Sequence, residues 1–398
     1  MMHQINILGM CMQTNFKVNI SVVGRFHAFD LAKQMQKNNV LNKLITTYPK
    51  FFTIKWDIPS KKIISELHLE LLNRYKRYIP FISNNHINMF LKERHDKNSI
   101  KFLDDIDVFI GWENVSLKTI VEAKKRGIIT ILEKGSAHKS FFIQNQIEEY
   151  KNKNDIYDVS YLSWGKDLVE YELVDYISIP SSFVKRTFLE YGIPEEKLLV
   201  NPYGVDLEQF KQEKKEDNIF RIIYAGGLTF HKGSHYLLQA FSELNLPNSE
   251  LCHLGTIKDE MKPFVEKYNN PKIKYLGHKP QDELYKYYSQ GSVFIFPSLL
   301  DGFGLVLLQA MACGLPIVCT TNTGGEDLIT KDGEEGFVIP IKSVEAIKEK
   351  ILYLYQNKDI CKEMGQKAKK RVEENFTWDD YGKRYIENLK QIMAKKNI

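Results

Sequence analysis

Short runs of β-branched and aromatic residues alternate with longer amphipathic stretches along most of the chain. In the first half, "KVNISVVG" (17–24) predicts a strand and "FHAFDLAKQMQKN" (26–38) predicts a helix. The alternation is repeated by "DVFIGW" (107–112), "SLKTIVEAKKRG" (116–127) and "IITILE" (128–133). Strands that alternate with helices are typical of a parallel sheet covered by helices on both faces.

A polar stretch divides this alternation into two parts. The segment 207–218, "LEQFKQEKKEDN", is rich in charge and predicts a linker. After it, "FRIIYAGG" (220–227) and "GSHYLLQAFSEL" (233–244) restart the pattern, which continues to "GFVIP" (336–340). A chain of 398 residues also exceeds the size at which one hydrophobic core keeps growing. The sequence therefore predicts two doubly wound Rossmann-like domains facing each other across a cleft, where the strands' carboxyl ends would bind ligand.

Composition narrows the class of protein. Hydrophobic residues make up 43% of the chain and charged residues 26%, as in an ordinary globular protein. A net charge of +5, without a recognition module or an arginine-rich tract, gives no support to nucleic-acid binding. No apolar run approaches the ~20 residues of a membrane helix, and residues 1–15 lack the pattern of a signal peptide. We therefore expect a cytoplasmic protein, or one on the inner face of a membrane.

The cysteines and acidic residues give no sign of a metal site. The five cysteines include no C-x-x-C pair and no zinc spacing, so we expect reduced, buried thiols; they are Cys11, Cys252, Cys313, Cys319 and Cys361. The stretch "DDID" (104–107) imitates a metal-binding D-x-D, but it precedes a strand instead of following one. We interpret it as a turn and expect no metal and no cofactor.

The segment from Lys50 to Lys101 departs from the alternation. It holds eleven lysines and arginines against five acids, an excess of six positive charges. Aromatic residues are interleaved with these charges: Trp56, Tyr75, Tyr78, Phe81 and Phe90. A solvated helical excursion would explain the pattern. A surface that meets anionic lipid headgroups would explain it equally well, and both interpretations stay open.

Two glycine turns carry candidate chemistry. In "YAGGLTFHKGSHYLLQAF" (224–241), Gly226 and Gly227 let the backbone approach a ligand, and Lys232 stands beside the start of the next helix. In "PSLLDGFGLVLLQAMACGLPIV" (297–318), a second turn opens onto an apolar helix. The positive end of a helix favours an anion such as phosphate. Glycines in such turns also occur for steric reasons alone, but two phosphate-competent turns in one domain favour a shared ligand.

The second turn contains two polar residues with alternative explanations. Asp301 begins the turn Asp301-Gly302-Phe303-Gly304, and Gln309 lies eight positions later inside the apolar helix. The carboxylate of Asp301 could serve as an ordinary helix cap. The amide of Gln309 could be satisfied by nearby backbone.

These residues resemble glycosyltransferase family 4, whose members are retaining enzymes of the two-Rossmann-domain GT-B fold. The resemblance rests on "DGFGLVLLQAMACGLPIV" (301–318), which is similar to the family's pattern of two glutamates eight apart. It is supported by "GLTFHKG" (227–233), "NTGGEDLI" (322–329) and "DGEEGFVIP" (332–340). It implies an N-terminal acceptor-side domain over 1–206 and a C-terminal domain binding the nucleotide sugar over 217–377. A last helix, about 378–398, would pack back on the first domain.

The resemblance also implies roles for single residues. Lys232 matches the lysine that contacts the donor's diphosphate, Asp301 matches the first glutamate, near the donor sugar, and Gln309 matches the second, which bonds the ribose. His138 is the candidate histidine near the donor sugar, with Glu133 as the second choice. The catalytic set is then Lys232, Asp301 and His138. The donor-binding set is Gly24, Arg25, His27, Gly226, Gly227, Lys232, His278, Asp301, Gly302, Phe303, Gly304, Leu305 and Gln309.

The implied activity is transfer of a hexose from a UDP- or GDP-sugar, with retention, to a glycan acceptor. The acceptor would be lipid-linked or part of a surface polysaccharide. Three positions depart from the family's pattern: Asp301 and Gln309 replace glutamates, and Gly227 stands where many members have arginine. Two alternatives stay open. One is an epimerase or hydrolase on the same fold, because a fold does not fix the chemistry. The other, which the three departures motivate, is a weakened partner subunit that binds a sugar nucleotide without turning it over.

Overall fold

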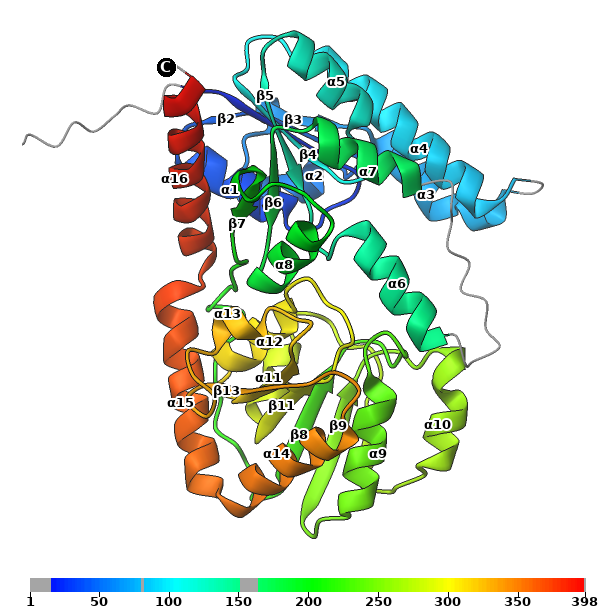
Figure 1. The fold of residues 1–398 in the computed structure, drawn as a ribbon, viewed down its shortest axis with the longest axis vertical. Helices are drawn as coiled ribbons and strands as arrows, with labels where there is room; N and C mark the ends of the chain where they lie inside the picture. Colours follow the sequence, from blue (N-terminus) through cyan, green and yellow to red (C-terminus); the bar gives the residue numbers. More distant parts are fainter. Residues whose placement is uncertain (1–15, 80–81, 151–163, 397–398) are drawn as a thin grey trace, which may run out of the picture. The chain divides into compact units, whose positions relative to one another are not determined.

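The computed structural model describes residues 16–79, 82–150 and 164–396 (Figure 1). Its strands build two parallel sheets, one from β1 to β7 and one from β8 to β13. The strands are β1 (Val18–Val22), β2 (Leu41–Thr46), β3 (Ile63–Ser65), β4 (Val108–Trp112), β5 (Ile129–Glu133), β6 (Tyr176–Ile179), β7 (Leu198–Val200), β8 (Phe220–Ala225), β9 (Ser249–Leu254), β10 (Ile273–Tyr275), β11 (Val293–Phe296), β12 (Ile317–Thr320) and β13 (Gly336–Ile339).

Helices connect these strands. They are α1 (Ala28–Lys37), α2 (Lys50–Thr53), α3 (Leu67–Tyr75), α4 (Asn84–Ser99), α5 (Leu117–Lys125), α6 (Lys139–Tyr150), α7 (Trp164–Leu173), α8 (Ser182–Glu190), α9 (Ser234–Leu244), α10 (Lys262–Lys267), α11 (Leu284–Ser289), α12 (Leu305–Ala312), α13 (Gly325–Leu328), α14 (Val344–Gln356), α15 (Lys358–Asn375) and α16 (Trp378–Lys396). The first half also contains short 3-10 helices, among them η1 (Ile54–Trp56), η3 (Lys76–Tyr78) and η4 (Ile100–Phe102). The predicted architecture of two Rossmann-like domains is confirmed.

The chain divides into two compact units. The first unit holds residues 1–131 and 386–398, and the second holds residues 132–385. In the first unit the strand order is β3-β2-β1-β4. Strands β1 and β4 are buried along their whole length, because helices cover both faces of a parallel sheet. Near the end of α16, Lys396 donates a hydrogen bond to the carbonyl of Gly127 in the same unit.

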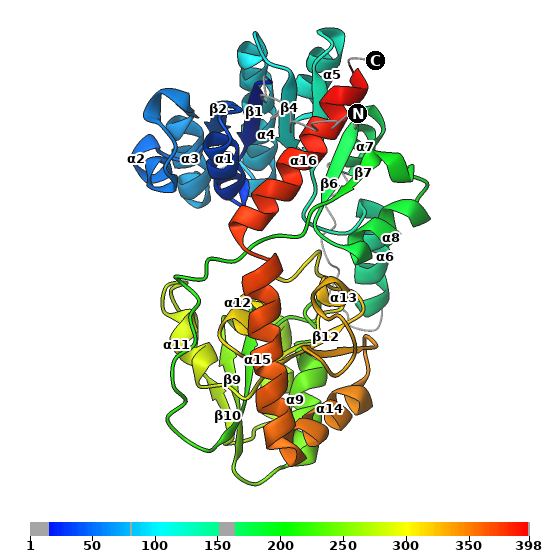
Figure 2. The same ribbon diagram turned by 90° about the vertical axis from the view of Figure 1, so that its left-hand side faces the viewer.

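In the second unit, the sheet β10-β9-β8-β11-β12-β13 has its topological switch between β8 and β11. The chain moves outward in one direction from β8 and then in the other from β11, so the loops that follow these two strands diverge. Helix α9 packs on α14, and α12 packs on α15 (Figures 1 and 2). Ligands of doubly wound sheets bind beyond the strand ends at such a switch. The two glycine turns of the sequence follow β8 and β11.

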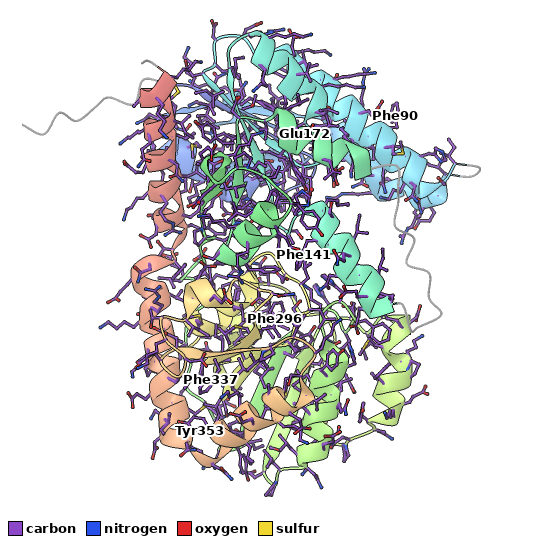
Figure 3. The ribbon with its side chains drawn as sticks, viewed as in Figure 1. Phe90, Phe141, Glu172, Phe296, Phe337 and Tyr353 are labelled. Carbon is purple, nitrogen blue, oxygen red and sulfur yellow. The ribbon has the colours of Figure 1, made fainter. Side chains whose placement is uncertain are left out.

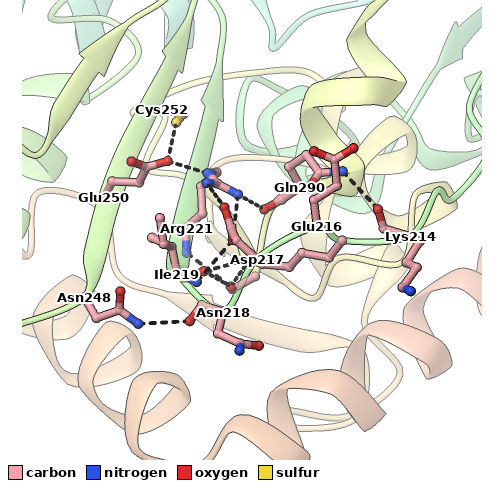
Figure 4. A network of polar contacts seen from close by, with 12 residues as sticks. Lys214, Glu216, Asp217, Asn218, Ile219, Arg221, Asn248, Glu250, Cys252 and Gln290 are labelled. Atoms are coloured by element: carbon pink, nitrogen blue, oxygen red, sulfur yellow. Dashed lines mark hydrogen bonds and ion pairs between the residues drawn. The ribbon is translucent and has the colours of Figure 1, made fainter.

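The predicted linker forms no helix or strand, and it is bound to the second sheet near the amino ends of strands β8 and β11. The guanidinium of Arg221 donates to Asp217, to Glu250 and to the carbonyl of Gln290, and Gln290 in turn donates to the carbonyl of Lys214 (Figure 4). A cavity of about 690 Å³ lies at this edge, and two thiols line it, those of Cys313 and Cys361. Burial raises the pKa of each thiol to about 12, so both stay protonated at neutral pH.

Several sequence-based expectations can be compared with these elements. Four of the cysteines are free and buried as predicted, and Cys11 lies outside the described residues. Residues 104–107 form a turn before β4, also as predicted. Residues 50–101 contain the edge strand β3 in addition to helices. Within the described residues, no helix is long and apolar enough to cross a membrane.

Candidate functional site

Glycines shape the turn after β8, and hydrogen bonds to two of its carbonyls fix its position. Gly226 has a φ of 139°, which favours glycine, and its carbonyl accepts a hydrogen bond from His253 Nε2 at 2.8 Å. The carbonyl of Gly227 accepts from the Tyr224 hydroxyl at 2.9 Å. Gly233, with a φ of 59°, caps α9 without a side chain. The first amides of α9 are therefore not covered by a capping group.

The turn after β11 has a similar construction. Asp301 lies three turn positions before Gly304, which has a φ of 80° and caps α12. The carboxylate of Asp301 accepts a bond from the Phe303 amide at 3.1 Å. Asp301 is therefore not the cap of α12. The cap was one of the two interpretations of Asp301 that the sequence left open. Leu305 is the first residue of α12, as the apolar pattern predicted.

The two turns touch. Lys232 Nζ forms an ion pair and hydrogen bond with Asp301. The backbone amide of Leu299 donates to the carbonyl of His231 at 3.1 Å. A side chain on Gly233 would meet the carbonyl of Pro297 at 2.0 Å, so only glycine fits there. The structure thus brings together residues 69 positions apart at the topological switch, where the sequence predicted one shared site.

Charge in this site is balanced by the Lys232–Asp301 pair. Burial pushes the pKa of Asp301 upward, but the ammonium of Lys232 and the Phe303 amide outweigh burial and hold that pKa below its usual value. Asp301 is therefore ionised at neutral pH. Burial, helped by Lys232, lowers the pKa of His231 to about 4, so its imidazole is neutral. Lys232 also lies 5.4 Å from the ring centre of Phe296, which Figure 3 labels. About a quarter of the Lys232 side chain is exposed, 25%.

Gln309 is buried in α12 but is not fully satisfied by protein. Its Oε1 accepts a long hydrogen bond, 3.4 Å, from the buried hydroxyl of Tyr288. Its amide nitrogen donates no hydrogen bond to any of the described residues. The alternative that nearby backbone satisfies the amide is not what the structure shows. The ribose contact stays a prediction.

The second turn is packed against the loop that follows β5, within the same unit. A side chain on Gly302 would meet the carbonyl of Gly135 at 2.0 Å. The carbonyl of Gly302 also accepts a bond from the Ser181 hydroxyl at 2.6 Å. The ring of Phe303 meets that of Tyr203 edge-on at 5.4 Å. Three separate segments therefore fix the position of this turn.

Sequence reasoning missed the aromatic residues around Glu133. Glu133 is buried and accepts a hydrogen bond from the Tyr385 hydroxyl at 2.7 Å. Burial, together with the nearby charges of Glu133 and Asp301, raises the pKa of Tyr203 well above its usual range. Tyr203 therefore remains a neutral hydroxyl between two carboxylates. No local pattern could have revealed the bond between Glu133 and Tyr385, because these residues are 252 positions apart.

His138 lies in an aromatic enclosure. Its ring stacks on Tyr191 at 4.6 Å and lies 5.1 Å from both Tyr171 and Phe188. Its Nδ1 accepts a bond from the Ser140 amide at 3.2 Å. Only 3% of the residue is exposed. This environment suits a packed imidazole, and the catalytic role of His138 stays a prediction.

The remaining predicted residues lie in two places. His278 is exposed in the loop after β10. In the first unit, Gly24 has a φ of 87° and donates its amide to Thr47 Oγ1 at 3.0 Å. Arg25 lies over the ring of Trp56 at 4.5 Å, and His27 lies 5.1 Å from Trp112. No group of three potential metal ligands occurs among residues 16–79, 82–150 and 164–396.

Comparison with known proteins agrees with this geometry. Residues 205–371, which contain both turns, match the family model of the glycosyl transferases group 1. A capsular polysaccharide biosynthesis glycosyltransferase, CapM of Staphylococcus aureus, is 28% identical over 244 residues, 56% of this chain and 63% of that protein. The O-antigen chain mannosyltransferase B of Escherichia coli is 29% identical over 40% of this chain and 42% of that protein. The matched part of the chain thus spans less than two thirds of these relatives.

A solved structure extends the likeness of the fold to almost the whole chain. The crystal structure of Anabaena Alr3699/HepE in complex with UDP and glucose matches 94% of this chain and 99% of that one, with a TM-score of 0.68. Its sequence identity is 13%, so this match concerns the fold alone. The chain therefore has the two-domain fold of the GT-B glycosyltransferases, and its residues 205–371 are similar to the glycosyl transferases of group 1.

Proposed function

We propose that this protein transfers a hexose from a nucleotide-activated donor to a glycan acceptor with retention at the anomeric carbon. The observation that carries the proposal is the Lys232–Asp301 pair at the switch between β8 and β11, flanked by the starts of α9 and α12. A lysine beside two helix amino ends suits a diphosphate. HepE, a protein of the same fold, binds UDP and glucose, which makes UDP-sugars the first donors to test.

In the proposed reaction the protein supplies electrostatic stabilisation and no nucleophile. Lys232 turns from Asp301 toward the diphosphate, and the uncovered amides of α9 and α12 donate to the same group. The leaving diphosphate takes the proton of the acceptor hydroxyl on the face where the new bond forms. Donors aimed at developing charge in a site shielded from water are usually the largest contribution to such catalysis. Gln309 would hold the ribose through its amide nitrogen.

The proposed acceptor is a lipid-linked or surface-polysaccharide glycan, and the proposed location is the cytoplasm or the inner face of the membrane. CapM and the O-antigen mannosyltransferase carry names from capsular and O-antigen synthesis, which supports this class of acceptor. The basic segment of residues 50–101 supports contact with an anionic membrane.

The test is turnover of labelled donors. A thermal-shift panel of UDP-, GDP- and ADP-sugars selects the donor, and incorporation of labelled sugar into an acceptor is then followed with membrane extract as the acceptor source. We expect transfer that EDTA does not abolish, because Lys232 and backbone dipoles meet the phosphate charge. Binding without any turnover would instead favour the weakened partner subunit, to which the Asp301, Gln309 and Gly227 departures point.

A further inference from the structure

We call the described residues of the segment 50–101 in the first unit the basic face; they form α2, η1, β3, α3, η3 and α4 with the described connections between these elements. Helices α3 and α4 pack on each other through a small core of Leu69, Ile87 and Leu91. Eight of the segment's basic side chains are exposed: Lys50, Lys55, Lys61, Arg74, Arg77, Arg94, Lys97 and Lys101. The basic face therefore presents most of its positive charge to solvent.

Most acidic residues of the basic face are buried. Three of the five acidic residues, Glu66, Glu70 and Asp96, are buried. Glu66 accepts hydrogen bonds from His95 and Asn98. Glu70 accepts from Thr47 and Arg74. Asp96 accepts from the backbone amides of Lys118 and Thr119.

The two exposed acids are also engaged. Asp57 pairs with Lys33 at 2.8 Å and Glu93 pairs with Lys118 at 3.6 Å. Both of these lysines lie outside the segment, at positions 33 and 118. Among the exposed lysines and arginines in the described part of the segment, only Arg74 pairs with one of the segment's own acids, Glu70. The exposed charges of the basic face, eight bases against two acids, keep the full excess of six positive charges that the sequence count gives.

The basic face also exposes large apolar side chains. Of the eighteen such side chains exposed among the described residues, nine lie within 51–90: Phe51, Ile54, Leu67, Leu71, Tyr75, Tyr78, Ile82, Met89 and Phe90. On α3, Leu67, Leu71 and Tyr75 are spaced by four residues and form one stripe along the helix. Phe90, labelled on α4 in Figure 3, is 57% exposed. A gathered apolar set of this kind marks an interaction surface.

We propose that the basic face docks on an anionic lipid bilayer. Exposed lysines and arginines attract anionic headgroups, and leucine, phenylalanine and tyrosine side chains enter the boundary between headgroups and acyl chains. A nucleic acid would use the charge but not the aliphatic stripe of α3. This inference deepens the proposed function, on which its purpose rests, since a lipid-linked acceptor lies at a membrane. Lipid binding itself can be measured without turnover.

Docking on this face would act directly on the Gly24–His27 loop of the same unit. The ring of Trp56 in η1 lies under the Arg25 guanidinium at 4.5 Å. On the other side, buried Glu70 of α3 accepts from Thr47 Oγ1 at 2.8 Å, and Thr47 accepts from the Gly24 amide. Both α3 and η1 thus position the loop that the sequence assigns to the donor side of the site.

The experiment is vesicle co-sedimentation of the full chain. Vesicles of phosphatidylcholine with phosphatidylglycerol are compared with phosphatidylcholine alone, at low and high salt. One variant changes Lys50, Lys55, Lys61, Arg77 and Arg94 to serine; its control changes five exposed lysines of the second unit, Lys262, Lys331, Lys362, Lys370 and Lys383. A second variant changes Leu71, Tyr75 and Phe90 to serine; its control changes Leu189, Tyr353 and Ile360, which are 40–42% exposed. Circular dichroism verifies that each variant is folded.

We expect wild type to bind the anionic vesicles at low salt and to dissociate at high salt, since surface attraction is screened. The basic variant should bind about 100-fold more weakly, or roughly 2.5-fold per removed charge, which is about half of the ~1 kcal/mol expected for a basic residue directly at an anionic surface. The apolar variant should bind about tenfold more weakly, and both controls should bind as wild type does. Wild type that stays in the supernatant, that binds both kinds of vesicle equally, or that binds no better than both surface variants would overturn the proposal. Intact lipid binding in a protein that turns over no donor would contradict only the proposed function.

Discussion

Charged groups are arranged in opposite ways in the two regions of this protein, the two glycine turns of the second unit and the basic face of the first unit. Around the turns, Lys232 and Asp301 neutralise each other, and the remaining donors are backbone amides at helix starts. On the basic face, the acids are buried or paired, while eight of the eleven bases are exposed. The first arrangement suits a small anion held at fixed distances. The second suits a broad charged surface.

This difference also agrees with the extent of the family model. The family model covers residues 205–371 and stops short of the basic face. A site built from backbone needs glycine at fixed positions, because Gly233 and Gly302 have no room for a side chain. A charged surface needs only many lysines and arginines, in no fixed order.

The largest effect that would sharpen the comparison is expected at Gly302. In Gly302→Ala the new carbon would lie 2.0 Å from the carbonyl of Gly135, so the turn must shift. We expect a loss of ~2–3 kcal/mol or more in the free energy of unfolding, measured by urea denaturation, and no detectable donor turnover. Gly165→Ala is the control, since nothing lies within 4 Å of its new carbon. Wild-type stability in Gly302→Ala would mean that the turn is not held rigidly.

Lys232→Ala should leave the fold intact and lower kcat/KM by ~100-fold or more, the scale of losing one charge-stabilising donor. The measurement is the steady-state rate with labelled donor. Lys258→Ala, at an exposed position in the same unit, serves as the control. Normal turnover in folded Lys232→Ala would remove this lysine from the site and break the contrast between the two regions.

The sequence was most informative where function depends on local backbone. The strand, glycine and helix patterns located Lys232, Asp301 and Gln309, and the structure brings Lys232 to Asp301. The partners of Glu133 could not be found, because the Tyr385 hydroxyl reaches it across 252 residues. Burial of Glu66, Glu70 and Asp96 was equally hidden, since a charge count treats every acid as exposed. Long-range packing, which no local period encodes, decides these features.

A smaller effect is expected at Gln309. Gln309→Leu should weaken donor binding by ~1–3 kcal/mol by leaving hydroxyls unpaired, while Gln309→Glu should preserve or tighten it. Tyr288→Phe is the matched control, because it removes the 3.4 Å bond to Gln309 and keeps the amide. Calorimetric titration of the donor measures all three. If Gln309→Leu and Tyr288→Phe bind the donor as wild type does, the amide is only structural.

The smallest effect concerns pH and His231. The pKa of His231 is about 4 in the folded protein and 6.5 in its unperturbed state, so between these values only the unfolded chain takes up the proton. Stability should therefore fall as the pH drops from 6.5 toward 4, by ~1–2 kcal/mol between pH 7 and pH 5 from this group. The urea midpoint of wild type is compared with that of His231→Asn, which keeps an acceptor for Gln146. An identical pH dependence in both proteins would show that His231 is not buried in its neutral form.

The central claim, that the paired turns of the second unit hold a diphosphate, is tested most directly by a crystal structure with the nucleoside diphosphate selected by the thermal-shift panel. We predict a diphosphate within hydrogen-bond distance of Lys232 Nζ and of the amides that begin α9 and α12, with the ribose at Gln309. A nucleotide bound elsewhere, or a bound diphosphate with Lys232 still held by Asp301 alone, would contradict the claim.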